Sequence, residues 1–419
     1  MITEMAKGFY WVGAVDWAIR HFHGFDLSTH RGTTYNSYLI MDKLNVLVDT
    51  VWAPFQEELL ANISRVIDTS KLDLIVTNHA ETDHSGALPR LMELCPNATI
   101  IVSKRGLESV PAHYHKPWKF RTVANGEKVN IGHNDLVFLE APMLHWPDSM
   151  FTYLTGHNIL MPNDAFGQHY ASAFRFNDQV DQDELFAEGL KYYANILTPF
   201  SDRVLKKIDE VIALNLPVSM IAPSHGVIWR NDPLQIVKKY QEWATQKFPP
   251  HAAVIYDTMW NGTENMAKAI GDGLSDEGLE YKLLHAAAND RNDMVVEIFK
   301  SNLVVLGSPT INNSVLPTIT PIVHELKSLR FQNKIGAAFG CYGWSGESVK
   351  HLEEILAASK IPIAKPGLKF KWQPKTEELE QCRCWGRELA RAAKQPGSQS
   401  NNVLTETVDQ ESAETRLRK

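Results

Sequence analysis

Residues 72–87 read LDLIVTNHAETDHSGA, an apolar, β-branched run followed at once by residue types that bind metals. The first six residues predict a buried strand, and a helix is expected to begin around the last one, Ala87. Between them lie four potential ligands, His79, Glu81, Asp83 and His84. In an extended loop alternate side chains share a face, so the first three can converge while the following turn brings in the fourth. The segment predicts a metal site at the end of a strand.

Three later residues could complete this site, since each follows an apolar run and is expected at a strand end. They are His145 in PMLHWP, Asp164 in NDAFG and His225 in PSHG. Together with the four residues of the first loop, these three resemble the metal ligands of the metallo-β-lactamase fold. Zinc members of that fold carry His-x-His-x-Asp-His on the first loop. In this sequence Glu81 occupies the position of the second His. A carboxylate is harder and more anionic than imidazole, which shifts preference from zinc toward iron or manganese. Asp164 as a shared bridge would suit two irons.

A second site is predicted where a strand at 253–256 leads into DTMWNGTEN and a helix from about residue 263. Hydroxyls, an amide and a glycine at a helix N-terminus suit a phosphate group. The loop lacks the lysine of GxxxxGK[ST], and no GxGxxG occurs, which disfavours a nucleoside triphosphate and a dinucleotide. It resembles the phosphate loop of flavodoxins, which binds FMN. The candidate FMN residues here are Thr258, Met259, Trp260, Asn261, Gly262 and Thr263.

Two further strand ends, GSPTINN (307–313) and FGCYGWSG (339–346), support the FMN interpretation. In a flavodoxin-like sheet the ligand lies where the loops at the carboxyl ends of the strands converge. Glycines let backbone amides approach the flavin ring, and an aromatic side chain could stack on it. The candidate residues are Ser308, Pro309, Thr310, Ile311, Asn312, Asn313, Gly340, Cys341, Tyr342, Gly343, Trp344, Ser345 and Gly346.

The order of the predicted elements indicates two domains. Residues 35–240 mix strands, loops and helices, and the FPP at 248–250 ends a helical pattern, because two prolines cannot continue a helix. Beyond it strands alternate with helices, which predicts a doubly wound parallel sheet. We expect an α/β protein with an αββα metallo-β-lactamase-like domain at 1–249, a flavodoxin-like domain at 250–393 and a disordered polar tail at 394–419.

Composition excludes other classes of protein. The 42 basic residues are outnumbered by 49 acidic ones, and the net charge of −7 disfavours nucleic acid or an anionic membrane as partner. No apolar run approaches the roughly 20 residues of a membrane helix. The four cysteines are too few to hold a chain of this length together by disulfides, and none of them forms a CxxC pair. A reducing cytoplasm is the expected compartment.

The two sites together resemble the flavodiiron proteins over about residues 1–393, and the wording PMLHWPDSM and NDAFGQHY is similar to the flavorubredoxin branch, the anaerobic nitric oxide reductases. The resemblance implies that FMN passes electrons to two irons, which reduce NO to N2O, or O2 to water. It also implies a head-to-tail homodimer or homotetramer. The branch carries a rubredoxin with two CxxC pairs, which this sequence lacks, so we expect a rubredoxin-type donor acting in trans or lost from the C-terminus. The implied ligands are His79, Glu81 and His145 for the iron nearer the flavin, Asp83, His84 and His225 for the other, and Asp164 as bridge.

His23 and Tyr193 are predicted to line the metal pocket as proton donors, with a packing role as the alternative for each. Three other functions stay open at this point: an oxygen reductase using the same site, a zinc hydrolase fused to a flavin domain, and an electron carrier in which only FMN works. Glu81 argues against the hydrolase, and the seven converging ligands argue against the electron carrier.

Overall fold

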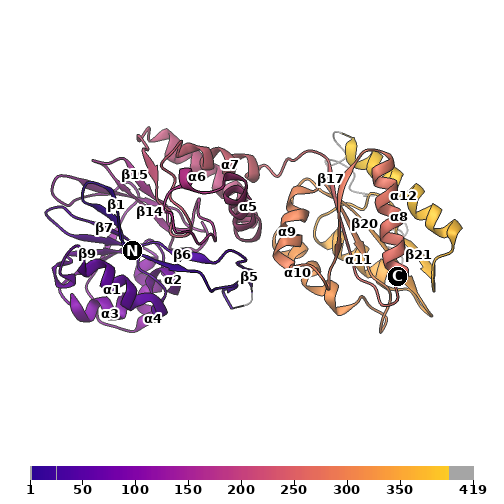
Figure 1. The fold of residues 1–419 in the computed structure, drawn as a ribbon, viewed down its shortest axis with the longest axis horizontal. Coiled ribbons are helices and arrows are strands. Elements are labelled where there is room, and N and C mark those ends of the chain that lie inside the picture. Colours follow the sequence, from indigo (N-terminus) through magenta and orange to yellow (C-terminus); the bar gives the residue numbers. More distant parts are fainter. Residues whose placement is uncertain (1, 25, 396–419) are drawn as a thin grey trace, which may run out of the picture. The chain divides into compact units, whose positions relative to one another are not determined.

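The computed structural model describes residues 2–24 and 26–395, and the predicted polar tail falls outside them from residue 396 on. The chain divides into two compact units (Figure 1). The first contains residues 1–249 together with 284–300 and 317–332. The second contains residues 250–283, 301–316 and those from 333 on.

Two sheets form the centre of the first unit. Within the described residues, one sheet has seven strands in the order β1-β2-β7-β8-β9-β10-β11 and the other has five in the order β12-β13-β14-β15-β16. Two further antiparallel pairs of short strands, β3 with β6 and β4 with β5, form separate two-stranded sheets. The strands are β1 (Thr3–Ala6), β2 (Phe9–Trp11), β3 (Ala14–Asp16), β4 (His21–Phe22), β5 (Leu27–Ser28), β6 (Thr33–Tyr35), β7 (Tyr38–Ile40), β8 (Val46–Val48), β9 (Leu74–Val76), β10 (Thr99–Ser103), β11 (Phe120–Val123), β12 (Lys128–Asn130), β13 (Asp135–Glu140), β14 (Met150–Leu154), β15 (Ile159–Met161) and β16 (Met220–Ile221).

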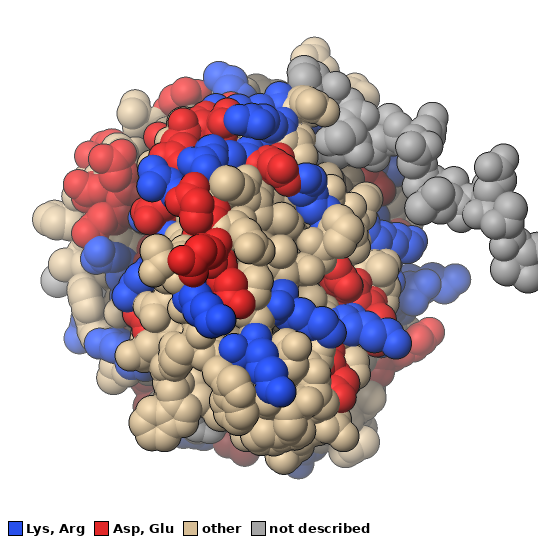
Figure 2. Space-filling model, turned by 90° about the vertical axis from the view of Figure 1, so that its right-hand side faces the viewer, with Lys and Arg blue, Asp and Glu red and all other residues tan. Residues whose placement is uncertain are grey.

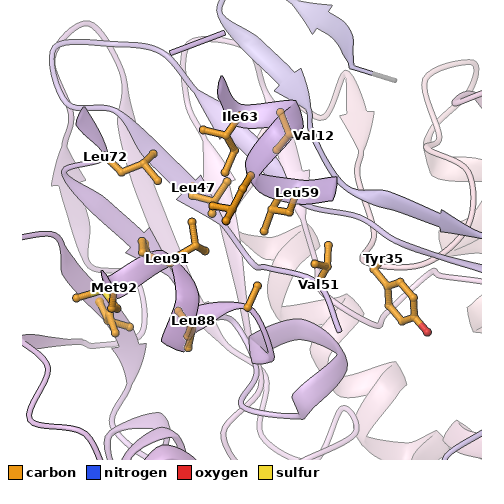
Figure 3. Close-up of a cluster of buried hydrophobic side chains, with 14 of the residues drawn as sticks. Val12, Tyr35, Leu47, Val51, Leu59, Ile63, Leu72, Leu88, Leu91 and Met92 are labelled. Carbon is orange, nitrogen blue, oxygen red and sulfur yellow. The ribbon is translucent and has the colours of Figure 1, made fainter. Parts of the chain in front are cut away.

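Helices cover the outer faces of both sheets, which gives the predicted αββα order (Figure 1). The alternation of side chains along β8 shows how: Leu47 packs against the helices (Figure 3), whereas Val46 and Val48 face the second sheet. On the first sheet lie α1 (Gln56–Ser64), α3 (Leu88–Leu94) and α4 (Gly106–Tyr114), and on the second lie α5 (Gln182–Tyr192), α6 (Ser201–Ala213) and α7 (Leu234–Ala244).

The second unit contains a five-stranded sheet in the order β18-β17-β19-β20-β21. Numbered from β17, this is the 2-1-3-4-5 order of flavodoxins, and the pairings of β17 with β19, β19 with β20 and β20 with β21 are parallel. The fold class predicted from the sequence is therefore confirmed. The elements from β17 on are β17 (His251–Tyr256), α8 (Gly262–Asp276), β18 (Glu280–His285), α9 (Arg291–Lys300), β19 (Leu303–Gly307), α10 (Thr320–Ser328), β20 (Ile335–Tyr342), α11 (Ser348–Ala358), β21 (Leu368–Lys371) and α12 (Thr376–Lys394). Of these, α9 and α10 belong to the first unit.

Surface charge on the second unit is mixed in sign. Figure 2 shows Lys and Arg side chains interspersed with Asp and Glu over this face. Part of the mixture comes from α12, whose Arg383 and Arg387 both pair with Asp276 of α8. None of the helices in the described part of the chain combines the length and the hydropathy of a membrane-spanning segment.

Helices α8 and α12 meet at two glycines, and this contact yields a stability prediction. A Cβ on Gly386 would lie 2.3 Å from the carbonyl oxygen of Ile270, so a larger residue must push the two backbones apart. We expect Gly386→Leu to lower the free energy of unfolding of this unit by about 1–3 kcal/mol or more. Urea unfolding measures it, with Gln381→Leu on the exposed face of α12 as control. Equal stability of the two variants would contradict the prediction.

Candidate functional site

The first cluster of predicted ligands lies where β9 ends. Glu81 precedes a single helical turn, α2 (Thr82–Ser85), which carries Asp83 and His84. The prediction of an extended segment was therefore wrong for Asp83, whereas the turn predicted at His84 and the helix predicted from about Ala87 are confirmed, since α3 begins at Leu88. The turn closes because the Ser85 hydroxyl donates to the carbonyl oxygens of Ala80 and Glu81, at 2.7 and 2.9 Å.

The second sheet supplies the other three predicted ligands. His145 lies in the loop between β13 and β14, Asp164 follows β15, and His225 follows β16. The structure thus brings all seven side chains together from the ends of strands in both sheets.

The carboxylate of Asp164 stands between two groups of ligand atoms. Its Oδ2 lies 3.8 Å from Nε2 of His79 and 3.6 Å from Nε2 of His145, and Glu81 Oε2 lies 3.1 and 3.5 Å from the same two nitrogens. We call His79, Glu81 and His145 the His79 group. Each nitrogen and oxygen is at a separation that a shared metal ion would impose on its ligands.

On the other side, Oδ1 of Asp164 lies 3.0 Å from Nε2 of His84 and 3.5 Å from Nε2 of His225. Oδ2 of Asp83 lies 3.2 and 3.1 Å from the same nitrogens. We call Asp83, His84 and His225 the His84 group. One carboxylate with an oxygen toward each group is the arrangement of a bridging ligand between two metals.

Groups behind the ligands fix the histidine rings. Nδ1 of His79 is 3.3 Å from Asp148 Oδ1, while the second oxygen of Asp148 accepts a hydrogen bond from the Ala80 N–H at 2.8 Å. Nδ1 of His225 is 2.6 Å from the carbonyl oxygen of Thr34. Such partners set which ring nitrogen is free to bind a metal, and here both leave Nε2 toward Asp164. Sequence reasoning missed Asp148, although it stands three residues after His145.

The site holds its carboxylates in the ionised form. Burial alone would raise the pKa of Asp164, but the neighbouring His84, His145 and His79 hold it well below the usual range. Burial likewise opposes a charge on His79, yet hydrogen bonds with Asp148 and Glu81 raise its pKa to about 9. Buried carboxylates are costly unless a cation compensates them.

Several ligand atoms are buried without a hydrogen-bond partner among the described residues. Both oxygens of Asp83, Nε2 of His84 and Oδ2 of Asp164 are buried and make no hydrogen bond of normal geometry to any part of the chain that the structure describes. Orphaned buried polar atoms call for a partner, and here all of them face one centre. The donor set, four imidazoles and three carboxylates, fits two metal ions and suits iron.

A cavity of about 400 Å³ leads to the metal site. Its lining contains the aromatic residues Phe22, Tyr35 and Trp52 together with the ligands Glu81 and Asp83. His23 also lines the cavity, with Nε2 2.8 Å from Glu81 Oε1 and its side chain 30% exposed. The structure therefore brings His23 to the place predicted for it, between solvent and the ligands.

Tyr193 does not lie in this pocket. It is completely buried, its hydroxyl lies 3.1 Å from the Ser201 hydroxyl, and its ring packs on Tyr240 and Trp243. The prediction was wrong because successive residues on a helix point about 100° apart, so the tyrosine pair cannot face one pocket. The neighbour Tyr192 faces the site instead, with its ring centroid 6.4 Å from that of His225.

His169 is a second residue of this wall that sequence reasoning missed. Its ring is 5.2 Å from that of His225 and 5.1 Å from that of Tyr192, and its Nδ1 lies 2.9 Å from the Thr33 hydroxyl. Burial, with the charge of His225 and His23, lowers its pKa well below the ordinary value, so it stays neutral. The segment GQHY carries no pattern that separates such a packed histidine from a ligand.

The three loops predicted to bind a flavin converge at the carboxyl ends of β17, β19 and β20. Thr310 N–H donates to the Cys341 carbonyl at 3.0 Å, and Cys341 Sγ is 3.2 Å from the Thr263 hydroxyl. Gly340 makes this approach possible, because a Cβ there would lie 2.0 Å from the Ser308 carbonyl oxygen. Loop residues Trp260 and Trp344 are strongly exposed, which is typical of a binding surface rather than a core.

The start of α8 has the properties of a phosphate site. Asn261 adopts a left-handed conformation (φ 64°) and makes no side-chain cap, so the first N–H groups of the helix lack a side-chain acceptor. The buried hydroxyl of Thr258 has no hydrogen-bond partner among residues 2–24 and 26–395. Donors that converge at a helix N-terminus and lack acceptors fit a phosphate dianion.

The segment after β21 also contributes to this site, which the sequence did not predict. Gln373 Nε2 donates to the Trp260 carbonyl at 2.6 Å, and Trp372 lies against Gly343 with most of its ring exposed. The strand LKFK is short and carries two lysines, so its pattern is typical of a solvated edge. Trp372 could have been placed at the loop cluster only if LKFK had been predicted to be the fifth parallel strand of the sheet.

Comparisons with known proteins match both halves of this description. Residues 33–226 match the family described as ODP family beta lactamase, and residues 254–386 match flavodoxin. The chain is 52% identical to the nitric oxide reductase of Moorella thermoacetica over 93% of this chain and 98% of that protein. It is 48% identical to the anaerobic nitric oxide reductase flavorubredoxin of Klebsiella pneumoniae, over 93% of this chain and 82% of that protein.

A solved structure agrees with the sequence relatives. Rubredoxin oxygen:oxidoreductase from Desulfovibrio gigas superimposes with a TM-score of 0.92 and 40% identity, over 94% of this chain and 99% of that one. Both identities extend over nearly the complete chains. The chain belongs to the flavodiiron proteins.

Proposed function

We propose that the protein is an oxidoreductase that reduces nitric oxide to nitrous oxide, with electrons passing from FMN to a non-haem diiron site. The observation that carries this is the pair of ligand groups sharing Asp164, in a chain 52% identical to a nitric oxide reductase. The reaction combines two NO with two electrons and two protons to give N2O and water. Two adjacent metals suit it because it joins two molecules of one gas.

Seven side chains would hold the metals. The His79 group would bind one iron and the His84 group the other, with one oxygen of Asp164 on each. When bound, the irons supply ligand positions for the gas and accept electrons one at a time. The chain itself orients the donors: Asp148 and the Thr34 carbonyl hold Nε2 of two histidines toward the centre.

Protons are the second requirement, and His23 is our proposed donor. It lines the access cavity, is partly exposed, and has Nε2 2.8 Å from an oxygen of the ligand Glu81. Tyr35 and Phe22 keep the rest of that wall apolar, which restricts bulk water at the ligands. A His23→Gln variant that kept its iron and turned over NO at the wild-type rate would remove this role.

The three loops after β17, β19 and β20 would hold FMN. Its phosphate would accept hydrogen bonds from Thr258 and from the N-terminus of α8. Bound FMN accepts electrons in pairs or singly, which is the chemistry needed between a donor and one-electron metals. The exposed indoles of Trp260, Trp344 and Trp372 provide apolar surface for its ring.

Thr258→Val tests the phosphate assignment. Valine has the shape of threonine but cannot donate, and a hydrogen bond to a charged group contributes about 1.5–3 kcal/mol. The Kd for FMN is expected to rise at least about tenfold, measured by quenching of FMN fluorescence on titration of the stripped protein. Thr258→Ser keeps the hydroxyl and should bind as the wild type does. An unchanged Kd in the valine variant would show that the FMN phosphate does not bind at Thr258.

Oxygen reduction by the same site is the second candidate, and the 40% identity to an oxygen:oxidoreductase favours it over any hydrolase. The two are separated with iron-loaded protein reduced through its flavin, by following NO and O2 with electrodes in separate anaerobic and aerobic runs. Fast NO loss with slow O2 loss supports the proposal. Faster O2 loss replaces it with oxygen reduction, and loss of neither gas overturns both.

The partners follow from the same family. A rubredoxin-type protein is the proposed electron donor, and a head-to-tail dimer or tetramer is the proposed assembly, with the FMN of one subunit facing the irons of the next. Sedimentation velocity tests the assembly: a monomer that still transferred electrons from flavin to iron at full rate would rule it out. The domain boundary at residue 249 and the cytoplasmic location stay predictions.

A further inference from the structure

A second cavity, of about 220 Å³, lies between the second sheet and its covering helices. Its floor is made by Phe151, Leu160 and Ile221 of β14, β15 and β16, and its roof by α6 and α7. Neither the metal groups nor the flavin loops use this space. It is separate from the access cavity, with which it shares no lining residue.

The lining is almost entirely hydrocarbon. Its few polar members include Lys207, which pairs with Glu210, and Asn215, which is exposed. The hydroxyl of Tyr240 accepts a hydrogen bond from the Phe166 N–H at 2.9 Å. A buried water needs two to four polar partners, and the inner part of the cavity does not offer them. Apolar space of this kind stays dry and takes up small apolar molecules.

Part of the cavity lining is next to metal ligands in the chain. Leu144 and Ala165 both line it and are buried, and each is the chain neighbour of a ligand, His145 in the first case and Asp164 in the second. The apolar lining is therefore continuous in the chain with two of the ligands. At the outer end Ile212 and Leu234 are exposed, so the mouth is apolar as well.

We propose that this cavity is a binding site for small apolar gas molecules that serves the metal site. The class of ligand is set by size and polarity: an engineered cavity of roughly 150 Å³ holds xenon or benzene, whereas a helix of about 10 Å diameter needs a far larger groove. NO, O2 and N2O are uncharged, weakly polar and small enough to enter. That these gases are the natural occupants rests on the proposed function; that the cavity takes an apolar gas does not.

Xenon is the probe for the site itself. Crystals of the holoprotein pressurised with xenon are expected to show xenon density between α6 and α7, next to Ile208 and Leu160. Density for a lipid tail or detergent that excludes xenon would overturn the proposal in favour of a lipid site, and an empty cavity would overturn it outright. This result is independent of turnover, so xenon binding in a protein that consumed no NO would reject the proposed function and leave the gas site standing.

Filling the cavity tests its use. Val204→Phe and Val211→Phe project a ring into it from positions two turns apart on α6, and the second starts from a half-buried residue that tolerates enlargement better. We expect each to lose xenon binding and to raise the KM for the gas several-fold, with kcat and the rate of flavin reduction unchanged. Lys206→Phe, on the exposed side of the same helix, is the matched control. Loss of xenon with a wild-type KM would overturn the role in substrate supply.

Discussion

Asp164→Ala is expected to empty both metal sites and to abolish NO consumption. The residue faces both ligand groups, with contacts of 3.0 and 3.6 Å to the nearest imidazole nitrogen on each side, so its loss removes one donor from each metal at once. Loss of a group behind a ligand costs 10–100-fold in metal affinity, and loss of the shared ligand should cost more than about 100-fold. Iron per chain by elemental analysis and NO consumption at an electrode measure the two effects.

Two controls separate this effect from a general loss of charge. Asp178→Ala removes a carboxylate that forms a surface ion pair with Arg230, and it should keep both irons. Asp164→Asn keeps the size of the side chain and one neutral oxygen donor, so partial metal binding is expected. Two irons per chain in the alanine variant, with activity within twofold of the wild type, would show that Asp164 is not the bridge.

Glu81→His should turn a site that prefers iron into one that prefers zinc. The change produces the His-x-His-x-Asp-His sequence of zinc members of the fold and removes one negative charge from the His79 group. Imidazole suits zinc at least as well as iron, whereas the carboxylate favours the harder metal. Because zinc has no redox chemistry, NO consumption should fall in proportion to the iron displaced, and by at least about tenfold when zinc is in excess.

The measurement loads metal-free protein with equal amounts of ferrous iron and zinc and then determines both metals. Glu81→Asp retains the carboxylate and should keep the preference for iron, although its shorter side chain places the oxygen farther from His79 and His145. His23 loses its 2.8 Å partner in the histidine variant but keeps it in part in the aspartate variant. A histidine variant that still chose iron as the wild type does would mean that geometry, not ligand type, selects the metal.

The sequence predicted the ligands because each stands directly after an apolar run, and the carboxyl ends of such strands meet at one edge. It could not predict the groups that hold them. Asp148 and the Thr34 carbonyl act through ring nitrogens that face away from the metals, and no spacing marks them. The error at Tyr193 has a similar origin, since a π-helical turn begins there and a pattern of apolar residues does not tell which of two adjacent tyrosines faces the site.

In the flavodoxin-like half the three ligand-binding loops were predicted from the sequence, but not every strand was. The run GCYG and the loop TMWNGT carry glycine and hydroxyl patterns that are specific to close backbone approach. The strand LKFK is placed by its pairing with β20, about thirty residues earlier in the chain, so its local pattern carried no signal for it.

The origin of the ligands in two different sheets also has a consequence for the life of the protein in a cell. Glu81 and His84 follow a strand of the first sheet, while His145, Asp164 and His225 follow strands of the second sheet. A bound pair of metal ions would therefore link the two sheets of the sandwich. Anything that binds only the folded chain stabilises it by mass action. Supply of iron would therefore set not only how active each molecule is but how many molecules escape proteolysis, which couples the amount of this protein to the iron status of its host.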